Sequence, residues 1–353
     1  MNAACILVTG IGGAVGNELA AVLADRAPKA EIIGVFSGES SRDAFLERSQ
    51  EQVVRIVRPM VCDLTDSEAT AGLAATLGAG RPTVLVHAAA NVSWSASHEA
   101  AWRGNVELTR NIADLARALG NTRFLLVSTA YTALNDCVYR NAYEETKAAA
   151  ERMLRTEYPD LDLSVFSCSL VVGHSQTGDI ARFHGLYPLI GLLERYQLPF
   201  MPGDEEGRID IVPVDWVAEE LYALVERLLD GGPAAEVVAA AGLAAPKLSE
   251  LTDGVLGVLN RIRRADGRPE LDGVPVVPFR RWDFLRRSIG AWGVQGIPMP
   301  NHQFLTWLIG IYRPYFEGGG VRPPSGVTRP APDWRDYVDI VVERWQAEQR
   351  RRR

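Results

Sequence analysis

Apolar and polar positions follow two alternating periods along roughly the first 170 residues of the chain. Short apolar, β-branched runs recur, and stretches of helix-forming residues separate most of them. The runs that we expect to form strands are Ile6–Val8, Ile32–Phe36, Val53–Val57, Val84–Val86, Phe124–Val127 and Leu163–Phe166. The stretches that we expect to form helices include Asn17–Asp25, Ser67–Leu77, Glu99–Leu119 and Ala142–Glu157. This alternation predicts right-handed βαβ units around a parallel sheet whose strands are buried on both faces.

This alternation of strand and helix patterns ends after residue 172, where Gly, Pro and aromatic residues cluster. The strand–helix pattern returns at Ile209–Val214, Trp216–Leu229 and Glu236–Ala241, and mainly helical sequence with Pro-rich joints follows. We therefore expect an α/β fold with a doubly wound parallel sheet. Its core would comprise residues 1–172 and a return segment, 207–242. A smaller, mainly helical C-terminal substrate lobe would comprise residues 173–206 and 243–353.

Composition and charge narrow the function classes. The 353 residues are 47% hydrophobic and 23% charged, which is typical of a globular protein. The formal net charge of −7 argues against non-specific binding to nucleic acid or to anionic lipid. No apolar run reaches the roughly 18 residues of a membrane-spanning helix, and no basic segment followed by an apolar core opens the sequence. We therefore expect a cytoplasmic protein without a membrane span.

Cysteine and histidine spacing predicts no metal site. The histidines form no HExxH or HxH pattern, and the cysteines form no CxxC pair. Scattered cysteines of this kind are expected to be reduced thiols. They are Cys5, Cys62, Cys137 and Cys168.

A glycine-rich segment follows the first expected strand and opens the first expected helix. It reads Thr9-Gly10-Ile11-Gly12-Gly13-Ala14-Val15-Gly16. Gly10 would permit a tight turn, Gly13 would let the backbone approach a pyrophosphate, and Gly16 would let the helix pack closely on the sheet. The free N–H groups and positive dipole end of a helix N-terminus favour such an anion. The segment therefore predicts a Rossmann-type dinucleotide site that includes Thr9, Gly12, Ala14 and Val15.

A second signal is the sequence Tyr143-Glu144-Glu145-Thr146-Lys147, within a stretch expected to be helical. Side chains four residues apart share one helix face. A phenol with an ordinary pKa of about 10 is a poor acid or base at neutral pH, and a nearby ammonium lowers that pKa by stabilising the phenolate. We predict that Tyr143 exchanges a proton with the substrate, and that Lys147 tunes Tyr143 and binds the cofactor ribose.

Two hydroxyls, Ser128 and Thr129, end the strand Phe124–Val127. Either could hold the substrate oxygen toward Tyr143, or could instead cap a turn. The family resemblance described next, and not the residues alone, favours Thr129 as the catalytic hydroxyl.

The GxxGxxG spacing resembles the extended branch of the short-chain dehydrogenase/reductase superfamily. Longer sequence segments resemble one group of that superfamily, the fatty acyl-CoA reductases and thioester reductases, or male-sterility-type NAD-binding proteins. These segments are His87–Trp94, Val127–Tyr131, Asn141–Lys147, Ser169–Gly178 and Asp210–Asp215. The resemblance covers roughly residues 5–240. It implies reduction of an acyl thioester, on coenzyme A or a carrier protein, to an aldehyde or an alcohol.

The resemblance also implies roles for further cofactor-binding residues. Asp63 and Leu64 end the third strand and would bind the cofactor, with the Asp63 carboxylate contacting the adenine amine. Ala88, Ala89 and Ala90, after the fourth strand, would line the ribose and nicotinamide.

Asn105 would serve as a structural or relay residue on the following helix. Ser169 and Val171 lie in the region that borders the nicotinamide. In that region the chain has Ser167 and Cys168 where the family usually has Arg-Pro. This departure leaves the pose of the substrate open.

The end of the second strand bears on the choice of cofactor. NAD-dependent enzymes place an acidic residue there, whereas NADP-dependent enzymes place an Arg or a set of small hydroxyls. Here no acidic residue closes the strand, and Ser37 and Arg42 could bind a phosphate. We therefore expect NADPH in preference to NADH.

Three functions follow from these residues. The first is an NAD(P)H-dependent reductase of an acyl thioester, delivered as a CoA ester or by a carrier protein. The second keeps the same residues but acts on a ketone or secondary alcohol of a specialised metabolite. The third, a cofactor-binding sensor without chemistry, is disfavoured because Thr129, Tyr143 and Lys147 are all present.

Overall fold

The computed structural model describes most of the chain, and the described residues form two compact units. The described residues are 4–79, 84–120, 123–132, 139–196, 198, 200–284, 299–317 and 321–352. The first unit comprises residues 1–169, 214–240 and 322–330. The second comprises residues 170–213, 241–321 and 331–353.

The first unit is built around a parallel sheet. Among the described residues the sheet has seven strands in the order β3-β2-β1-β4-β5-β6-β10, and every neighbouring pair is parallel. The strands are β1 (Cys5–Thr9), β2 (Glu31–Phe36), β3 (Val57–Val61), β4 (Val84–His87), β5 (Arg123–Thr129), β6 (Asp162–Cys168) and β10 (Glu236–Ala239). The chain order reverses between β1 and β4, and this is the point at which doubly wound sheets bind ligands.

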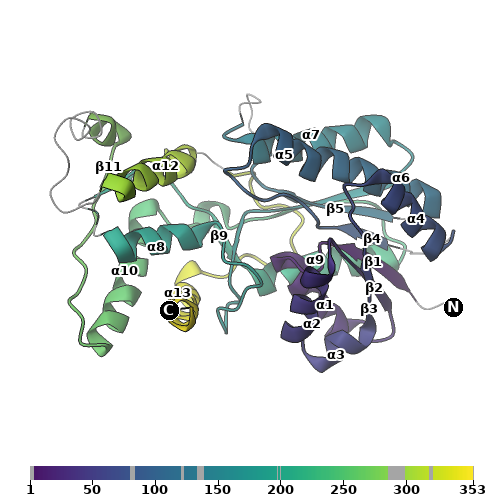
Figure 1. The fold of residues 1–353 in the computed structure, drawn as a ribbon, viewed down its shortest axis with the longest axis horizontal. Helices are drawn as coiled ribbons and strands as arrows, with labels where there is room; N and C mark the ends of the chain where they lie inside the picture. Colours follow the sequence, from purple (N-terminus) through teal and green to yellow (C-terminus); the bar gives the residue numbers. More distant parts are fainter. Residues whose placement is uncertain are drawn as a thin grey trace. The chain divides into compact units, whose positions relative to one another are not determined.

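Two layers of helices cover this sheet (Figure 1). Helix α1 packs against α9 on one face, and α6 packs between α4 and α7 on the other. The helices of the first unit are α1 (Ala14–Arg26), α2 (Glu39–Arg48), α3 (Glu51–Ile56), α4 (Ser67–Leu77), α5 (His98–Trp102), the π-helix η1 (Arg103–Glu107), α6 (Leu108–Leu119), α7 (Ala142–Glu157) and α9 (Val214–Leu229). The predicted doubly wound α/β architecture is therefore confirmed.

The sheet interior forms the hydrophobic core. All residues of β1 and β4 are buried, as expected for central strands covered on both faces. On the face beneath α6, Leu85, Ile112 and Phe124 are fully buried in one apolar cluster. Burying each such side chain contributes about 1.5–3 kcal/mol, so this face fixes the strands that carry the site.

The expected strand Val53–Val57 is wrong. Glu51–Ile56 is helix α3, and the strand β3 begins only at Val57. Because β3 is the edge strand, most of its side chains are exposed or half-exposed, and no continuous apolar run marks it. The apolar residues that precede it instead belong to a short helix that buries Val53.

Two further differences concern helices. Helix α2 was not expected from the pattern, because Phe45 is its only buried residue and its other positions are polar or half-exposed. The single expected helix Glu99–Leu119 is instead three consecutive segments, α5, the π-helix η1 and α6. Such π-turns inside helices often occur at functional sites.

The return segment divides between the two units. The expected strand Ile209–Val214 is β9 (Ile211–Pro213), which pairs with β7 (Leu170–Val172) in a small sheet of the second unit. The expected strand Glu236–Ala241 is β10, which joins the main sheet beside β6. Residues 170–172, 207–213 and 241–242 thus lie in the second unit, whereas we had grouped them with the core.

Residues 322–330 return to the first unit from late in the chain. The Ser325 N–H donates to the Val238 carbonyl at 3.2 Å, and the Arg322 N–H donates to the Ala130 carbonyl at 2.9 Å. The Thr328 hydroxyl donates to the buried carboxylate of Glu220 at 2.7 Å. This segment therefore fastens the last strand of the sheet and the residue that follows β5.

The second unit is mainly helical, as the sequence predicted. Helix α10 packs against α8 and α13, and the Tyr337 hydroxyl donates to the Ile211 carbonyl at 3.0 Å. Its elements are β7, α8 (Leu186–Tyr196), β8 (Met201–Pro202), β9, the 3-10 helix η2 (Gly242–Ala244), α10 (Leu248–Ala265), β11 (Val276–Val277), α12 (Met299–Phe316), the 3-10 helix η3 (Trp334–Asp336) and α13 (Val338–Arg351).

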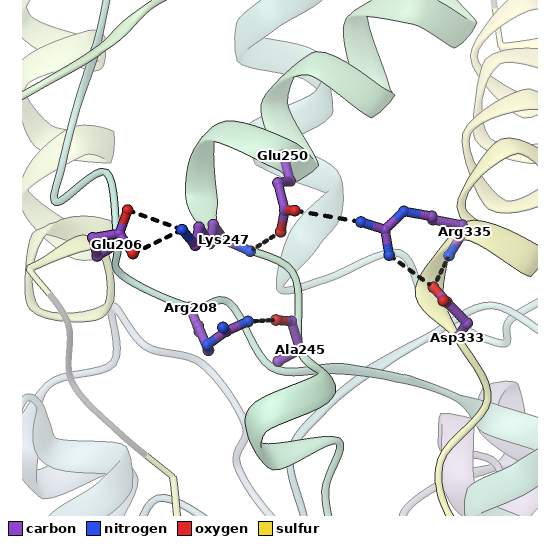
Figure 2. Close-up of polar contacts among 7 residues, drawn as sticks. All are labelled: Glu206, Arg208, Ala245, Lys247, Glu250, Asp333 and Arg335. Atoms are coloured by element: carbon purple, nitrogen blue, oxygen red, sulfur yellow. Dashed lines mark hydrogen bonds and ion pairs between the residues drawn. The ribbon is translucent and has the colours of Figure 1, made fainter.

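A polar network at the start of α10 joins three segments of this unit (Figure 2). The Lys247 ammonium contacts the Glu206 carboxylate at 2.7 Å, and the Lys247 N–H donates to Glu250 at 2.9 Å. The Arg335 guanidinium contacts Glu250 at 3.3 Å, and the Arg335 N–H donates to Asp333 at 3.0 Å. Because these groups are largely exposed, we interpret the network as a structural clasp of modest strength.

Candidate active site

The glycine loop forms a cradle that larger residues would fill. Gly10 has φ +72°, and a Cβ there would lie 2.5 Å from the Ala89 nitrogen. A Cβ at Gly16 would lie 2.4 Å from the Gly10 carbonyl oxygen, and one at Gly12 would lie 2.9 Å from the Ser41 hydroxyl. The loop therefore needs glycine both for its backbone conformation and for its close approach to the segment after β4.

The first turn of α1 fits a bound pyrophosphate. The helix begins at Ala14 with Gly13 as its N-cap, and no side chain caps it. The Gly13 N–H donates to the Gly10 carbonyl at 2.9 Å, which closes the loop. The N–H groups of Ala14, Val15 and Gly16 are the first of the helix and lack carbonyl partners earlier in it. An anion at this position would receive them together with the positive end of the helix dipole.

A buried histidine joins the ends of the two central strands. His87 Nδ1 lies 2.8 Å from the Thr9 hydroxyl, and Nε2 lies 3.0 Å from the Thr109 hydroxyl. Burial lowers the pKa of His87 to about 3, and the charge of Lys147 acts in the same direction. The imidazole is therefore neutral and serves as a hydrogen-bonded link between β1, β4 and α6.

The segment after β4 lies against the glycine loop. The Ala88 N–H donates to the Thr9 carbonyl at 3.1 Å, and the Ala89 N–H lies 3.3 Å from the Thr9 hydroxyl. Ala90 follows directly. These contacts bring Thr9, Gly10, Ala88 and Ala89 together at the reversal point of the sheet, where we predicted the cofactor to lie.

Asn105 is buried in the π-helix η1, and its amide is fully engaged. Its Oδ1 accepts the Asn91 N–H at 2.8 Å. Its Nδ2 donates to the Asn91 carbonyl at 3.2 Å and to the Thr146 hydroxyl at 2.9 Å. This geometry favours the structural alternative for Asn105, because it ties the segment after β4 to the helix that carries Tyr143 and Lys147.

Helix α7 positions the two candidate catalytic side chains. The Asn141 Oδ1 caps the helix by accepting the Glu144 N–H at 3.0 Å, so Tyr143 lies in the first turn and Lys147 one turn later. A side-chain hydrogen bond joins Tyr143 to Thr129, the last residue of β5. The Lys147 ammonium is buried and donates to the Val127 carbonyl at 2.8 Å.

The expected lowering of the Tyr143 pKa is not what the structure gives. Burial raises the pKa of Tyr143 above its ordinary value of 10, and the hydrogen bond with Thr129 only partly opposes this effect. Burial also lowers the pKa of Lys147 to about 8, with the Glu151 carboxylate opposing. The reason is that both groups lie out of water, so that desolvation of the charged forms outweighs the interactions that favour those forms.

The two hydroxyls that end β5 have different partners. Ser128 donates to the Glu151 carboxylate on α7, whereas Thr129 bonds to Tyr143. Thr129 is therefore the hydroxyl that the structure places beside Tyr143.

Residues near the outer strands are more exposed. The Asp63 carboxylate is exposed and accepts the Thr65 hydroxyl at 2.7 Å, and this bond lowers the pKa of Asp63. Leu64 is buried, and its carbonyl accepts from Asn111 at 2.9 Å.

Ser37 and Arg42 lie beyond the end of β2. Ser37 is exposed, and the Arg42 guanidinium is paired with Asp43 at 2.8 Å and Glu39 at 3.6 Å. Arg42 therefore already has acidic partners on its own helix.

Two predicted residues, Ser169 and Val171, fall on either side of the division between the units. Ser169 is buried in the first unit, where its N–H donates to the Ala239 carbonyl at 3.0 Å. Val171 belongs to β7 of the second unit and pairs with Val212. Only Ser169 is thus part of the unit that carries the glycine loop.

Sequence reasoning missed Glu151, and also a buried ion pair beside Tyr143. Arg140 and Glu144 contact each other at 2.9 Å with almost no exposure, and Arg140 lies 4.8 Å over the Tyr131 ring. Nothing in the local pattern separates this pair from ordinary surface charges on a helix. Glu151 did have a signal, since it follows Lys147 by the same four-residue step that separates Lys147 from Tyr143.

The described residues contain no group of three His, Cys, Asp or Glu side chains that could hold a metal ion. Cys5, Cys62 and Cys168 are buried free thiols, and Cys137 lies outside the described residues. No helix within the described part of the chain is long and apolar enough to cross a membrane.

Two family models match parts of the chain. A family model described as "Male sterility protein" matches residues 135–221, and one described as "Polysaccharide biosynthesis protein" matches residues 6–161. No curated protein matches the sequence.

Three solved structures have a similar fold at low identity. The terminal R domain of the myxalamid PKS-NRPS pathway has a TM-score of 0.71 and 18% identity, over 98% of this chain and 91% of that one. A thiolation-reductase di-domain from an archaeal non-ribosomal peptide synthetase has a TM-score of 0.70 and 15% identity, over 99% and 76%. A UDP-N-acetylglucosamine 4-epimerase from Methanobrevibacter ruminantium M1 has a TM-score of 0.67 and 15% identity, over 99% and 100%.

The two family models together match residues 6–221, and the solved structures share the Rossmann-type fold. In these respects the chain is similar to NAD(P)-binding proteins.

Proposed function

We propose that the protein reduces an acyl thioester, bound to coenzyme A or to a carrier protein, to the aldehyde or alcohol. The main support is the male-sterility family match over residues 135–221, a stretch that includes Tyr143 and Lys147. Similarity over nearly the whole chain to reductase domains from two carrier-dependent pathways adds to it. A carrier protein is therefore our proposed partner when the substrate is not a CoA ester.

The cofactor would supply a hydride to the thioester carbonyl carbon. Tyr143 and Thr129 would hold the carbonyl oxygen between their hydroxyls. Because burial raises its pKa, Tyr143 is protonated at neutral pH and suits the role of proton donor to the developing oxyanion. The resulting hemithioacetal would release a thiol and the aldehyde.

The cofactor would lie along the reversal point of the sheet. The N-terminus of α1 would hold the pyrophosphate, and Ala88, Ala89 and Ala90 would line the ribose and nicotinamide. Lys147 would bind the ribose, Asp63 and Leu64 would lie near the adenine, and Ser169 would border the nicotinamide. Each of these assignments is a proposal.

We propose NADPH as the preferred cofactor. Ser37 and Arg42 follow β2, where a 2′-phosphate would lie, and the Ser41 hydroxyl lies close to Gly12. Arg42 already pairs with two carboxylates, those of Asp43 and Glu39. A 2′-phosphate would have to compete with them for the guanidinium. This competition predicts a moderate rather than a strict preference.

A second candidate is oxidation–reduction at a ketone or secondary alcohol, which includes the sugar carbons of a nucleotide sugar. It is favoured by the polysaccharide-biosynthesis match over residues 6–161 and by the fold similarity to a 4-epimerase. Ser167 and Cys168, which replace the usual Arg-Pro, also keep it open.

One assay separates these candidates. Purified protein is mixed with NADPH or NADH and a panel of acyl-CoA thioesters, acyl-carrier proteins, ketones and UDP-sugars. Loss of the nicotinamide absorbance together with release of free thiol would support thioester reduction. Reaction only with ketones, or interconversion of UDP-sugars without net cofactor loss, would support the second candidate and refute the first.

A further inference from the structure

Helix α7 carries three functional groups at four-residue steps. Tyr143, Lys147 and Glu151 share one face of the helix, which packs against the end of β5. Tyr143 and Lys147 belong to the proposed reaction, whereas Glu151 takes no direct part in it. Its contacts place it in the same group of side chains.

Each of these three side chains of α7 contacts a different one of three consecutive residues of β5. Lys147 donates to the Val127 carbonyl at 2.8 Å, Ser128 donates to the Glu151 carboxylate, and Thr129 bonds to Tyr143. The three side chains of the helix are thus each fixed by one residue of a three-residue stretch of the strand. Ser128 is only 3% exposed, and its bond to the half-buried Glu151 is partly buried.

Lys147 is itself only 3% exposed, and a buried ammonium is costly without a compensating charge. The titratable groups that act on it or face it come from three elements. Burial keeps His87 of β4 and Cys168 of β6 uncharged, since it lowers the pKa of His87 to about 3 and raises that of Cys168 to about 11. Tyr143 of α7 is also uncharged, because burial raises its pKa. Glu151, also on α7, provides the largest attraction that favours the charged form of Lys147.

We propose that Glu151 is a positioning residue that keeps Lys147 charged, with Ser128 holding the Glu151 carboxylate in place. The inference rests on the proposed function, in which a charged Lys147 binds the ribose and orients Tyr143. A neutral lysine would lose a donated hydrogen bond and its attraction for the developing oxyanion. Loss of Glu151 should therefore act through the charge of Lys147 rather than through the fold.

The chain offers a direct measurement, because its three lysines are Lys29, Lys147 and Lys247. Protein with ¹³Cε-labelled lysine, titrated by NMR without substrate, reports each lysine separately. In Glu151→Gln, Ser128 can still donate to the amide oxygen, so packing is retained while the charge is removed. We expect the Lys147 titration to move to lower pH by about one unit or more, and the other two lysines to stay unchanged.

Two variants control this experiment. Glu157→Gln removes a carboxylate from the same helix, where it pairs with Arg110 at the exposed surface, and should leave the Lys147 titration in place. Glu151→Asp restores the charge and should return most of the shift. An unmoved Lys147 titration in folded Glu151→Gln would overturn the proposal, as would an equal shift in Glu157→Gln.

Kinetics provide the second measurement, once a substrate is known. Because Lys147 acts in its charged form, activity should fall as pH rises through its titration. In Glu151→Gln this fall should begin about one pH unit lower, with a raised KM for the cofactor at pH 8 that is relieved at pH 6. A KM that is raised equally at both pH values would indicate a structural role instead. The NMR result does not depend on the substrate, so failure of the proposed thioester reaction and failure of this inference can be told apart.

Discussion

The polar groups at the ends of the central strands are buried, whereas those beyond the end of β2 are more exposed. The side chains that end β1, β4 and β5 are buried and hydrogen-bonded, namely Thr9, His87 and Thr129. Lys147 of α7 is also buried and donates to the backbone of β5. Beyond the end of β2, Ser37 is exposed and Arg42 is paired with surface carboxylates. In the proposed function, buried and hydrogen-bonded groups would fix the geometry of the reaction, whereas the choice of cofactor would depend on charged groups that can exchange partners in water.

The largest expected effect concerns the buried centre. Tyr143→Phe removes the proton donor but keeps the ring, so turnover should fall by roughly 10²- to 10⁴-fold, while cofactor affinity changes little. Steady-state kinetics and cofactor fluorescence titration measure the two quantities. Tyr158→Phe, at the other end of α7, is the matched control and should retain turnover. Retained turnover in Tyr143→Phe would remove Tyr143 from the chemistry.

The next effect is a pH dependence of stability that arises from His87. In the unfolded chain its imidazole takes up a proton as pH falls through about 6.5, but in the folded protein it does so only near a pKa of about 3. The unfolded state therefore binds more protons in this window, and the free energy of unfolding falls as pH falls. Between pH 7 and pH 5 we expect a loss of about 2 kcal/mol from this group.

Denaturant unfolding at several pH values checks this expectation. His87→Gln has no group to titrate, so its stability should change less with pH than that of the unaltered protein. Parallel curves for the two proteins would show that His87 is not held neutral by burial.

A smaller effect on cofactor affinity is expected from Arg42, which lies beyond the end of β2. Arg42→Ala should raise the KM for NADPH by roughly 5- to 10-fold, which corresponds to one charge-assisted hydrogen bond, and should leave the KM for NADH nearly unchanged. Arg48→Ala, at the other end of α2, controls for loss of a surface charge. Equal effects of Arg42→Ala on both cofactors would exclude Arg42 from the 2′-phosphate site.

The smallest effect is expected in the network of Figure 2. Arg335→Ala removes the exposed contacts with Glu250 and Asp333 and should lower the free energy of unfolding by less than about 1 kcal/mol. Thermal or denaturant unfolding at low and high salt measures this. A loss of several kcal/mol would show that the network is more than a surface clasp.

The sequence carried enough information for the central region and less for the rest. Gly10 and Gly16 were predictable because their jobs depend on the missing Cβ, and the Tyr143–Lys147 pair because four residues make one helical turn. Strand β3 was misplaced because an edge strand lacks the apolar run of a buried one, and α2 because it buries little more than Phe45.

The site also held features that local patterns do not encode. The raised pKa of Tyr143 depends on how deeply the folded chain buries the phenol, and the proton state of Lys147 depends on strand residues packed against it. Glu151 could have been found by extending the four-residue spacing by one further step. Its partner Ser128 could not, because their contact exists only after β5 and α7 have packed.

The return of residues 322–330 to the first unit has a consequence for biosynthesis. The hydrogen bond from Arg322 to Ala130 joins positions nearly 200 residues apart in the chain, and it lies directly after the residue that contacts Tyr143. On the ribosome, the first unit therefore cannot be completed when its first 169 residues have emerged. It must wait, with the end of β5 lacking this bond, until residues 322–330 have been synthesised.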